Sequence, residues 1–272
     1  MAKTIMITGA SRGFGKLWAE ALLQRGDNVV AAVRNLHSLD SLVAKYGERL
    51  LPLELDVTDR AASFQAVAKA KSHFGSIDVL INNAGFGLFG AIEESSEAEA
   101  RAQMETNFFG LLWLTQAVLP IMREQQHGHI IQLSSVLGVV SVPILGIYNA
   151  SKFAVEGLSE TLASEVKGFG INVTLVEPNQ FATDWAGTSA KQAESISAYD
   201  QVRAGFYSQV TEDNIGIPEA TTAGILELID SKNPPLRLLL GKVGTPWIKQ
   251  VYQGKLAEWD AWKQTADAAH GK

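Results

Sequence analysis

A short apolar run, a glycine-rich turn and an amphipathic helix follow one another directly at the start of the chain. The run is Ile5-Met6-Ile7, the turn is Thr8 to Gly15, and the helix carries the apolar stripe Leu17, Ala21 and Leu22. A strand that passes through glycines into a helix N-terminus presents backbone amides and the positive end of a dipole, which together can cradle a phosphate. A tight turn with a nearby C-cap glycine would explain the glycines alone, but not this order of elements.

The rest of the chain repeats the alternation of apolar runs and helical periodicity. Further strands are expected at residues 28–34, 50–55, 77–81, 129–133, 171–176 and 236–240. Strands that alternate with helices form a parallel sheet that is covered by helices on both faces. No linker, repeat or low-complexity segment interrupts the pattern, so we expect one α/β domain over all 272 residues.

Polar residues stand where several of these strands end. Asp56 follows the third strand, Asn82-Asn83-Ala84-Gly85 follows the fourth, and Ser135 follows the fifth. Ligands of open α/β sheets bind at the carboxyl ends of the strands, so this placement favours a site role. Asp56 could accept a hydrogen bond from an adenine amino group or be a turn residue. The asparagines could tie neighbouring backbones together or simply make a turn.

Tyr148 and Lys152 stand four residues apart at the start of a helical pattern that runs to Val166. Positions i and i+4 share one face of a helix, so an ammonium group is expected beside a phenol. A free phenol titrates near ~10, and a neighbouring positive charge lowers that value. The pair is therefore a candidate proton donor and acceptor, although a solvated Tyr and Lys would show the same spacing.

Three other stretches leave their role open. Asn107 lies inside a helical pattern from Glu97 to Gln125, where asparagine competes for backbone groups and is most simply a satisfied core residue. Residues 183–216 are expected to form a structureless or loosely helical loop, and loops of this length are usually lids or binding segments. A C-terminal helical extension is expected over about residues 245–265, with tryptophans that pack on the body or on a partner, and residues 266–272 are expected to fray.

The composition excludes several classes of protein. The net charge is −6 and no basic tract is longer than a pair, so nucleic acid and anionic membranes are poor partners. The chain has no cysteine, which rules out disulfides, a thiolate nucleophile and cysteine metal sites, and we name no metal ligands. Since no signal-peptide pattern or bilayer-length apolar run is present, a cytoplasmic protein is expected.

Five motifs, taken in their joint order and placement, resemble those of the short-chain dehydrogenase/reductase family. They are Thr8-Gly9-x-x-x-Gly13-x-Gly15, Asn82-Asn83-Ala84-Gly85, Asn107, Ser135 and Tyr148-x-x-x-Lys152. The resemblance is close over about residues 3–185 and looser beyond them. It implies a Rossmann-type, doubly wound fold with a seven-stranded parallel sheet, and hydride exchange between a nicotinamide and a carbonyl or alcohol.

The resemblance also implies roles for single side chains. Tyr148 would be the general acid/base, Ser135 would hydrogen-bond the substrate oxygen, and Lys152 would lower the pKa of Tyr148 and hold the nicotinamide ribose. Asn107 would position a water that connects Lys152 to solvent. Carbonyl reduction builds negative charge on oxygen, which two hydroxyl donors would stabilise. The expected cofactor-binding residues are Gly9, Ser11, Arg12, Gly13, Phe14, Gly15, Arg34, Asp56, Val57, Asn83, Ala84, Gly85, Tyr148, Lys152, Pro178 and Thr183.

One position departs from the family pattern. The family usually has Pro-Gly after the sixth strand, whereas this chain has Pro178-Asn179. Asparagine tolerates a positive φ better than most residues, so the turn is expected to survive. The added side chain is expected near the nicotinamide or the substrate.

The end of the second strand favours NADP(H) over NAD(H). An NAD site usually places an Asp or Glu there, where the carboxylate accepts from the ribose hydroxyls. This strand instead ends in Arg34, and Arg12 in the glycine turn is expected to approach the same spot. Two guanidinium groups can grip a 2′-phosphate in bidentate fashion. The alternative is that both arginines face solvent, with Arg12 paired to a carboxylate.

We therefore expect an NADP(H)-dependent alcohol dehydrogenase or ketone reductase. The alternative is a non-catalytic nucleotide-sensing or scaffold protein on the same fold. The substrate is expected to be a small hydrophobic carbonyl or alcohol, because an apolar pocket is suggested by Phe86, Phe89, Val136, Leu137 and Trp185.

Two further expectations concern assembly and motion. The helices at 97–125 and after Tyr148 carry more apolar positions than one buried stripe requires, and in the resembled family such helices commonly pair between subunits. A homodimer or homotetramer is expected, unless both faces pack within one chain. Residues 183–216 are expected to be mobile without ligand and to become ordered over the substrate.

Overall fold

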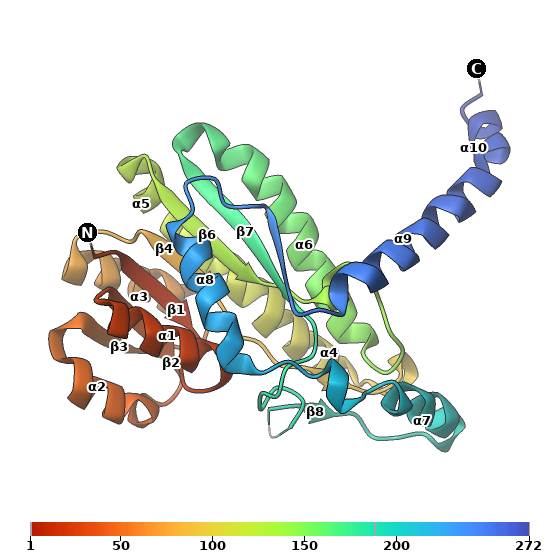
Figure 1. The fold of residues 1–272 in the computed structure, drawn as a ribbon, viewed down its shortest axis with the longest axis horizontal. Helices are drawn as coiled ribbons and strands as arrows, with labels where there is room; N and C mark the ends of the chain where they lie inside the picture. Colours follow the sequence, from red (N-terminus) through yellow and green to blue (C-terminus); the bar gives the residue numbers. More distant parts are fainter. Residues whose placement is uncertain (1, 188, 272) are drawn as a thin grey trace.

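A parallel sheet forms the centre of the molecule, as seen in a computed structural model that describes residues 2–187 and 189–271 (Figure 1). The sheet has seven strands in the order β3-β2-β1-β4-β6-β7-β9. These strands are β1 (Thr4–Thr8), β2 (Asn28–Val33), β3 (Leu50–Glu54), β4 (Val79–Asn82), β6 (Gly128–Leu133), β7 (Ile171–Pro178) and β9 (Arg237–Leu240). The expected seven-stranded, doubly wound parallel sheet is confirmed.

Helices cover both faces of this sheet. The helices are α1 (Gly13–Arg25), α2 (Asp40–Tyr46), α3 (Arg60–Phe74), α4 (Glu97–Met104), α5 (Gly110–Gln125), α6 (Gly146–Val166), α7 (Asp200–Ser208), α8 (Thr221–Asp230), α9 (Gly244–Ala261) and α10 (Lys263–Ala269). One core cluster joins the sheet to α1, α2 and α8, and a second joins it to α3, α5 and α6. The alternation of side chains along β1 makes this division visible, because Ile5 and Ile7 enter the first cluster and Met6 the second.

The predicted helix from Glu97 to Gln125 is wrong in its middle. A π-helical turn, Glu105–Phe109, separates α4 from α5 and contains Asn107. Such turns are rare and are frequent at functional sites. Here the turn contains Asn107, which is buried and whose side chain forms hydrogen bonds with the Phe86 backbone.

The prediction of a loose loop at residues 183–216 is also wrong in part. This segment contains β8 (Lys191–Gln192), which pairs with β5 (Leu88–Phe89), and the helix α7. The buried carboxylate of Glu94 fixes it to the body, because Oε1 accepts from the Ile196 amide at 2.7 Å and pairs with Arg203 at 2.5 Å. These hydrogen bonds, of which the one from Ile196 is the strongest, lower the pKa of Glu94.

The C-terminal helices α9 and α10 extend away from the body of the molecule (Figure 1). Residues 266–269, which were expected to fray, belong to α10 instead, and Lys272 lies outside the described residues. Trp259 and Trp262 are 64% and 66% exposed, so these two tryptophans do not pack on the body. No helix in the described part of the chain is both long and apolar enough to span a bilayer.

Candidate active site

The glycine turn between β1 and α1 has a shape that side chains would prevent. Gly9 and Gly13 have φ of +67° and +53°, in the left-handed region that favours glycine. A Cβ on Gly15 would lie 2.3 Å from the carbonyl oxygen of Gly9. The helix α1 that follows has no side-chain cap and no acidic residue in its first turn. Its N-terminal amides are therefore available to an anion, as the sequence predicted.

Two polar side chains clamp this turn to the end of β4. The Thr8 hydroxyl oxygen accepts from the amides of Asn83 and Ala84, both at 3.0 Å. The side-chain Nδ2 of Asn83 donates to the backbone carbonyl oxygens of Thr8 at 2.8 Å and Gly9 at 3.2 Å. The interpretation of the asparagines as ties between backbones is confirmed for Asn83.

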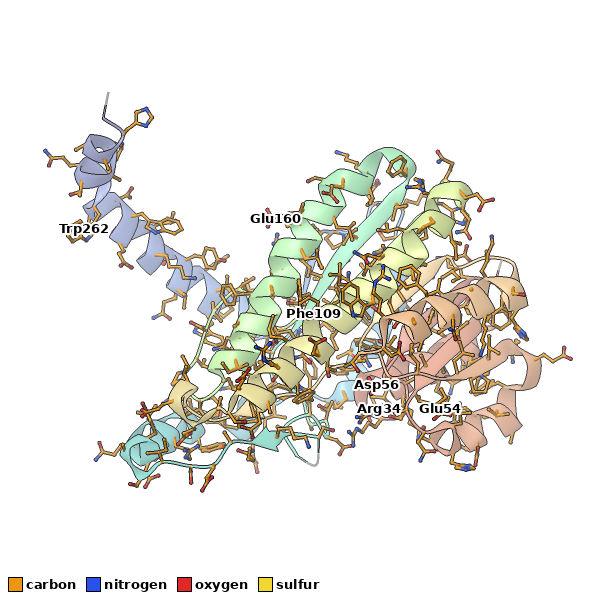
Figure 2. The ribbon with its side chains drawn as sticks, turned by 180° about the vertical axis from the view of Figure 1, so that it is seen from behind. Arg34, Glu54, Asp56, Phe109, Glu160 and Trp262 are labelled. Atoms are coloured by element: carbon orange, nitrogen blue, oxygen red, sulfur yellow. The ribbon has the colours of Figure 1, made fainter. Side chains whose placement is uncertain are left out.

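The predicted phosphate-reading arginines lie beside this turn. Arg12 and Arg34 are both exposed, and within residues 2–187 and 189–271 neither side chain forms a hydrogen bond or an ion pair. A carboxylate partner for Arg12 is thus not found in the described part. Figure 2 shows Arg34 at one edge of the molecule together with Glu54 and Asp56. Glu54, which was not predicted as a site residue, is exposed at the end of β3 beside the last residue of β2.

The other predicted cofactor residues divide into exposed and buried groups. Asp56 accepts from the Thr58 amide at 3.0 Å and its hydroxyl at 2.8 Å, so it shapes a turn with one carboxyl oxygen. The Val57 side chain is buried in the core, and the half-buried Phe14 ring packs on Trp18 and Phe181. The Thr183 Cβ lies 3.9 Å from where a Cβ on Gly13 would be, which brings the chain after β7 against the glycine turn.

Ser135, Tyr148 and Lys152 come together at the carboxyl end of β6. Ser135 follows that strand, and its hydroxyl faces the phenol of Tyr148, which lies in the first turn of α6. The Lys152 Nζ lies 5.7 Å from the centroid of the Tyr148 ring and donates to the Leu133 carbonyl oxygen at 2.7 Å. All three residues are buried, with 5–7% of their surface exposed. The structure therefore assembles the predicted triad.

The charge states of this triad are governed by burial. Burial raises the pKa of Tyr148 well above its ordinary value, and the hydrogen bond with Ser135 opposes that change only in part. Burial lowers the pKa of Lys152 to about 8, while the nearby Glu156 carboxylate raises it. The net change in the Tyr148 pKa is upward because desolvation dominates, and a lowering contribution from Lys152 stays a prediction. Tyr148 is consequently a neutral hydroxyl, which can donate a proton.

Asn107 is a hydrogen-bonded core residue in this structure. Its side chain accepts from the Phe86 amide at 3.1 Å and donates to the Phe86 carbonyl at 3.0 Å and to the Ser151 hydroxyl at 3.2 Å. Ser151 in turn donates to the Tyr148 carbonyl at 2.7 Å. Asn107 thus fixes the chain after Gly85 against the helix that carries Tyr148. A role in holding water stays a prediction.

Asn179 differs from its expected conformation. It does not adopt a positive φ, and its amide donates to the Leu240 carbonyl at 3.0 Å, continuing the β7–β9 pairing. Its side chain lies against Gly241, where a Cβ would be only 1.8 Å from the Asn179 Oδ1. The glycine that makes room for Asn179 therefore stands after β9, and the expected positive-φ turn is wrong.

An apolar cluster surrounds the Tyr148 ring. Trp185 packs on it with ring centroids 4.8 Å apart and on Phe89 at 5.5 Å. A Cβ on Gly87 would come within 2.6 Å of the indole, so this glycine is required for the packing. Leu137 belongs to the same cluster. The predicted apolar residues Phe89, Leu137 and Trp185 therefore do gather around Tyr148.

Several residues that shape the site were not predicted from the sequence. Thr8 stood in the motif but was given no role, although it clamps two amides. Gln103 is fully buried and bonds the backbones of Leu88 and Phe86, and no sequence signal marks it. Glu156 had a signal, because it stands four residues after Lys152 and shares its helix face.

Comparison with known proteins identifies the class to which this fold and site belong. The model of the family described as short chain dehydrogenase matches residues 3–194. The chain belongs to this family of oxidoreductases. It is 42% identical over 263 residues to Oxidoreductase BOA17 of Botryotinia fuckeliana, with 95% of this chain and 94% of the relative covered. It is 38% identical to the 3-ketodihydrosphingosine reductase of Bacteroides thetaiotaomicron, with 94% and 92% covered.

Solved structures agree with this assignment. A short-chain dehydrogenase from Streptomyces avermitilis shares 37% identity with a TM-score of 0.92, and 98% of each chain is covered. A short-chain dehydrogenase from Burkholderia cenocepacia in complex with NADP shares 26% identity with a TM-score of 0.77, with 96% of this chain and 97% of that chain covered. The similarity extends over the C-terminal part that the family model leaves unmatched.

Proposed function

We propose that this protein is an NADP(H)-dependent oxidoreductase that interconverts a hydrophobic ketone or aldehyde and the corresponding alcohol. The observation that carries the proposal is the buried contact between the Ser135 and Tyr148 hydroxyls, with the Lys152 ammonium one helical turn away. The bound nicotinamide supplies the hydride. The protein has to bind the carbonyl, stabilise its developing negative charge and move one proton.

The two hydroxyls divide this work. In the direction of reduction, Tyr148 gives its proton to the carbonyl oxygen as general acid, and the neutral state of the buried phenol suits that step. Ser135 donates a hydrogen bond to the same oxygen. Lys152 stabilises the phenolate that is left behind, because its positive charge lies close to the ring. In the direction of oxidation, the same groups act in reverse.

The residues at the glycine turn fit the adenosine end of NADP(H). The left-handed glycines and the uncapped start of α1 leave room and donors for a pyrophosphate. Arg12 and Arg34 carry two charges beside this turn with no carboxylate paired to them in the described residues, which suits a 2′-phosphate. The NADP complex of the related Burkholderia cenocepacia structure supports the same choice.

The apolar cluster at Tyr148 supports a hydrophobic substrate. Trp185, Phe89 and Leu137 would border the carbonyl carbon's substituents. The relative named 3-ketodihydrosphingosine reductase acts, by that name, on a ketone with a long apolar chain, which is compatible with such a wall. Because Trp185 covers Tyr148 in this structure, we infer that residues 183–216 shift when substrate binds. A homodimer or homotetramer is part of the same proposal.

A spectrophotometric screen tests this function. NADPH oxidation would be followed with a panel of ketones that runs from short aliphatic to long-chain and aromatic members. We expect turnover with the apolar members, and only background oxidation with the Ser135→Ala variant. Tight NADPH binding without turnover of any ketone, or of any alcohol in the reverse assay with NADP⁺, would instead favour the nucleotide-sensing or scaffold role.

A further inference from the structure

Two buried carboxyl groups face each other behind Lys152. Glu156 stands one helical turn after Lys152 on α6, and Glu177 is the residue before Pro178 at the end of β7. They are 6% and 1% exposed, and Arg237 Nε approaches both carboxyl groups, at 3.1 Å from Glu156 Oε2 and 3.4 Å from Glu177 Oε1. Glu156 and Glu177 are called the carboxyl pair below.

Two buried carboxyl groups beside one guanidinium group favour a state in which one of them is protonated. The Oε1 atoms of Glu156 and Glu177 are buried and have no donor in hydrogen-bonding geometry within the described residues. Arg237 Nε lies 3.4 Å from Glu177 Oε1 but gives its proton to Glu156 Oε2, at 3.1 Å. The Ser134 hydroxyl also faces Glu156, and ionised carboxylates only accept, so one proton held by the pair is what would give Glu177 Oε1 a partner. Burial and the Glu156 charge raise the pKa of Glu177 to about 8, and burial also raises the pKa of Glu156.

The charges around the carboxyl pair balance when it holds one proton. Lys152 and Glu160 face it from α6, Arg237 faces it from β9, and Tyr252 approaches from α9. Arg237 Nη2 also donates to Glu160 Oε2 at 2.8 Å. The positive charges of Lys152 and Arg237 then match one negative charge on the pair and one on Glu160. Loss of the shared proton leaves one excess negative charge near Lys152.

Solvent reaches this proton by a route that does not pass through the glycine turn. A cavity of about 460 Å³ lies between α6, β9 and α9, and Glu177 and Arg237 line it. Its remaining wall is formed by Val139, Glu160, Leu239, Ile248 and Tyr252. Figure 2 shows Glu160 on α6, the helix that also carries Tyr148 and Lys152. A proton on Glu177 can therefore exchange with water while the catalytic face is covered.

We propose that the carboxyl pair is a positioning device that keeps Lys152 charged as the pH rises. When the shared proton leaves through the cavity, the pair gains a second negative charge, and this charge holds the ammonium proton on Lys152. The inference rests on the proposed function, in which the Lys152 charge stabilises the Tyr148 phenolate. The pair touches neither substrate nor reacting atoms, and it acts only through Lys152.

The pH dependence of kcat/KM tests the proposal. In Glu177→Gln a neutral amide replaces the protonated acid, so kcat/KM below about pH 7 should match wild type. The alkaline decline of kcat/KM should occur at a pH about one unit lower than in wild type. The double variant Glu156→Gln/Glu177→Gln, which has no charge at either site, should lose activity at still lower pH. Glu160→Gln is the matched control, because Glu160 is an exposed and therefore screened partner of Arg237, and its alkaline limb should move much less than that of Glu177→Gln.

Two results would contradict the proposal. In one, kcat/KM of Glu177→Gln is reduced by the same factor at every pH; in the other, its alkaline decline occurs at the same pH as in wild type. Either result would mean that Glu177 contributes only to packing.

A readout without turnover separates this failure from failure of the proposed function. NMR of isotope-labelled lysine follows the titration of Lys152 directly, and its midpoint should fall in Glu177→Gln and much less in Glu160→Gln. Infrared spectroscopy should show one buried neutral carboxylic acid near pH 7, lost in Glu177→Gln. If that band is missing from wild type, the carboxyl pair holds no proton and the inference is wrong.

Discussion

The two ends of the parallel sheet differ in how completely their polar groups are hydrogen-bonded. At the amino end, Asp27 accepts from the Lys3 amide at 3.0 Å, and Asp78 accepts from the Thr4 amide at 2.7 Å. At the carboxyl end, buried side-chain oxygens of Asn82, Glu177 and Asn179 have no hydrogen-bond partner in the described residues. We call the amino end closed, because side chains there hydrogen-bond the first strand amides, and the carboxyl end open, because buried polar atoms there lack partners.

This difference separates stability from function. Carboxylates at the amino end satisfy the first amides of the strands and hold the sheet together. The carboxyl end keeps its donors and acceptors incomplete, and burial there displaces the pKa values of Tyr148 and Lys152. Displaced pKa values and unpaired buried polar atoms have a cost that the rest of the fold must offset, and they gather at functional sites. Substitutions at the two ends should therefore have opposite signatures.

The largest effect is expected from Tyr148→Phe at the carboxyl end. Removal of one hydroxyl deletes the proposed proton transfer and should lower kcat by about 10²–10⁴-fold. The free energy of unfolding should change little, because the ring and its packing on Trp185 remain. Cofactor affinity, measured by NADPH fluorescence, should also stay near wild type. A well-folded Phe variant with near wild-type turnover would remove Tyr148 from the mechanism.

A smaller change is expected from Arg34→Asp at the same end. The carboxylate would repel a 2′-phosphate and accept from ribose hydroxyls, so the ratio of kcat/KM for NADPH and NADH should fall by about tenfold or more. Glu54→Gln is a control for general charge effects, because Glu54 stands beside this position without a bond to Arg34 in the described residues. Wild-type preference for NADH, or an unchanged ratio in Arg34→Asp, would contradict the phosphate assignment.

The sequence predicted what depends on short stretches of chain. The strands, the glycine turn and the placement of Ser135 and Tyr148 at the carboxyl end follow from apolar runs, glycine spacing and helical periodicity. Each of these patterns lies within about ten residues. The residues of the site could therefore be named before their geometry was known.

The parts that were not predicted depend on contacts between distant residues. The π-turn at Asn107 is explained by its bonds to Phe86, 21 residues away. Helix α7 is held by Glu94, more than 100 residues before Arg203. Spacing showed that Lys152 would lie near Tyr148, but it could not show how deeply both would be buried, and burial decides the direction of their pKa values.

At the amino end, the buried side chain of His129 should make the free energy of unfolding depend on pH. This side chain is 6% exposed, and its Nε2 donates to the Thr174 hydroxyl at 2.9 Å, which donates to the Pro235 carbonyl. Burial, with a smaller contribution from Lys3, lowers the pKa of His129 to about 4. The unfolded chain takes up a proton below its pKa of about 6.5, and the folded chain does not, so stability falls as the pH drops from there toward 4.

The expected loss from His129 between about pH 7 and pH 5 is about 2 kcal/mol. Urea unfolding at both pH values measures it, and the difference between them should shrink by that amount in His129→Gln. Because the unfolding free energies at the two pH values are subtracted, any effect of the substitution on packing that does not depend on pH cancels. His270→Gln, at the exposed end of α10, is the matched control and should leave the difference as it is in wild type. Turnover per folded molecule should not change in either variant.

The smallest effect, with the opposite sign, is expected two residues earlier at His127. Its Nε2 lies 2.9 Å from Asp78 Oδ1, and this hydrogen bond, with a second to the Gln125 carbonyl, raises the pKa of His127. A raised pKa means that the stabilisation is complete below the unfolded value of about 6.5 and is lost as the pH rises through the folded value. The side chain is 58% exposed, so the pair is screened and should contribute at most about 1 kcal/mol. His127→Ala should therefore destabilise the protein slightly at about pH 6, by less at about pH 8, and by less in high salt. A cost that is larger at the higher pH would show that the ion pair with Asp78 does not stabilise the amino end.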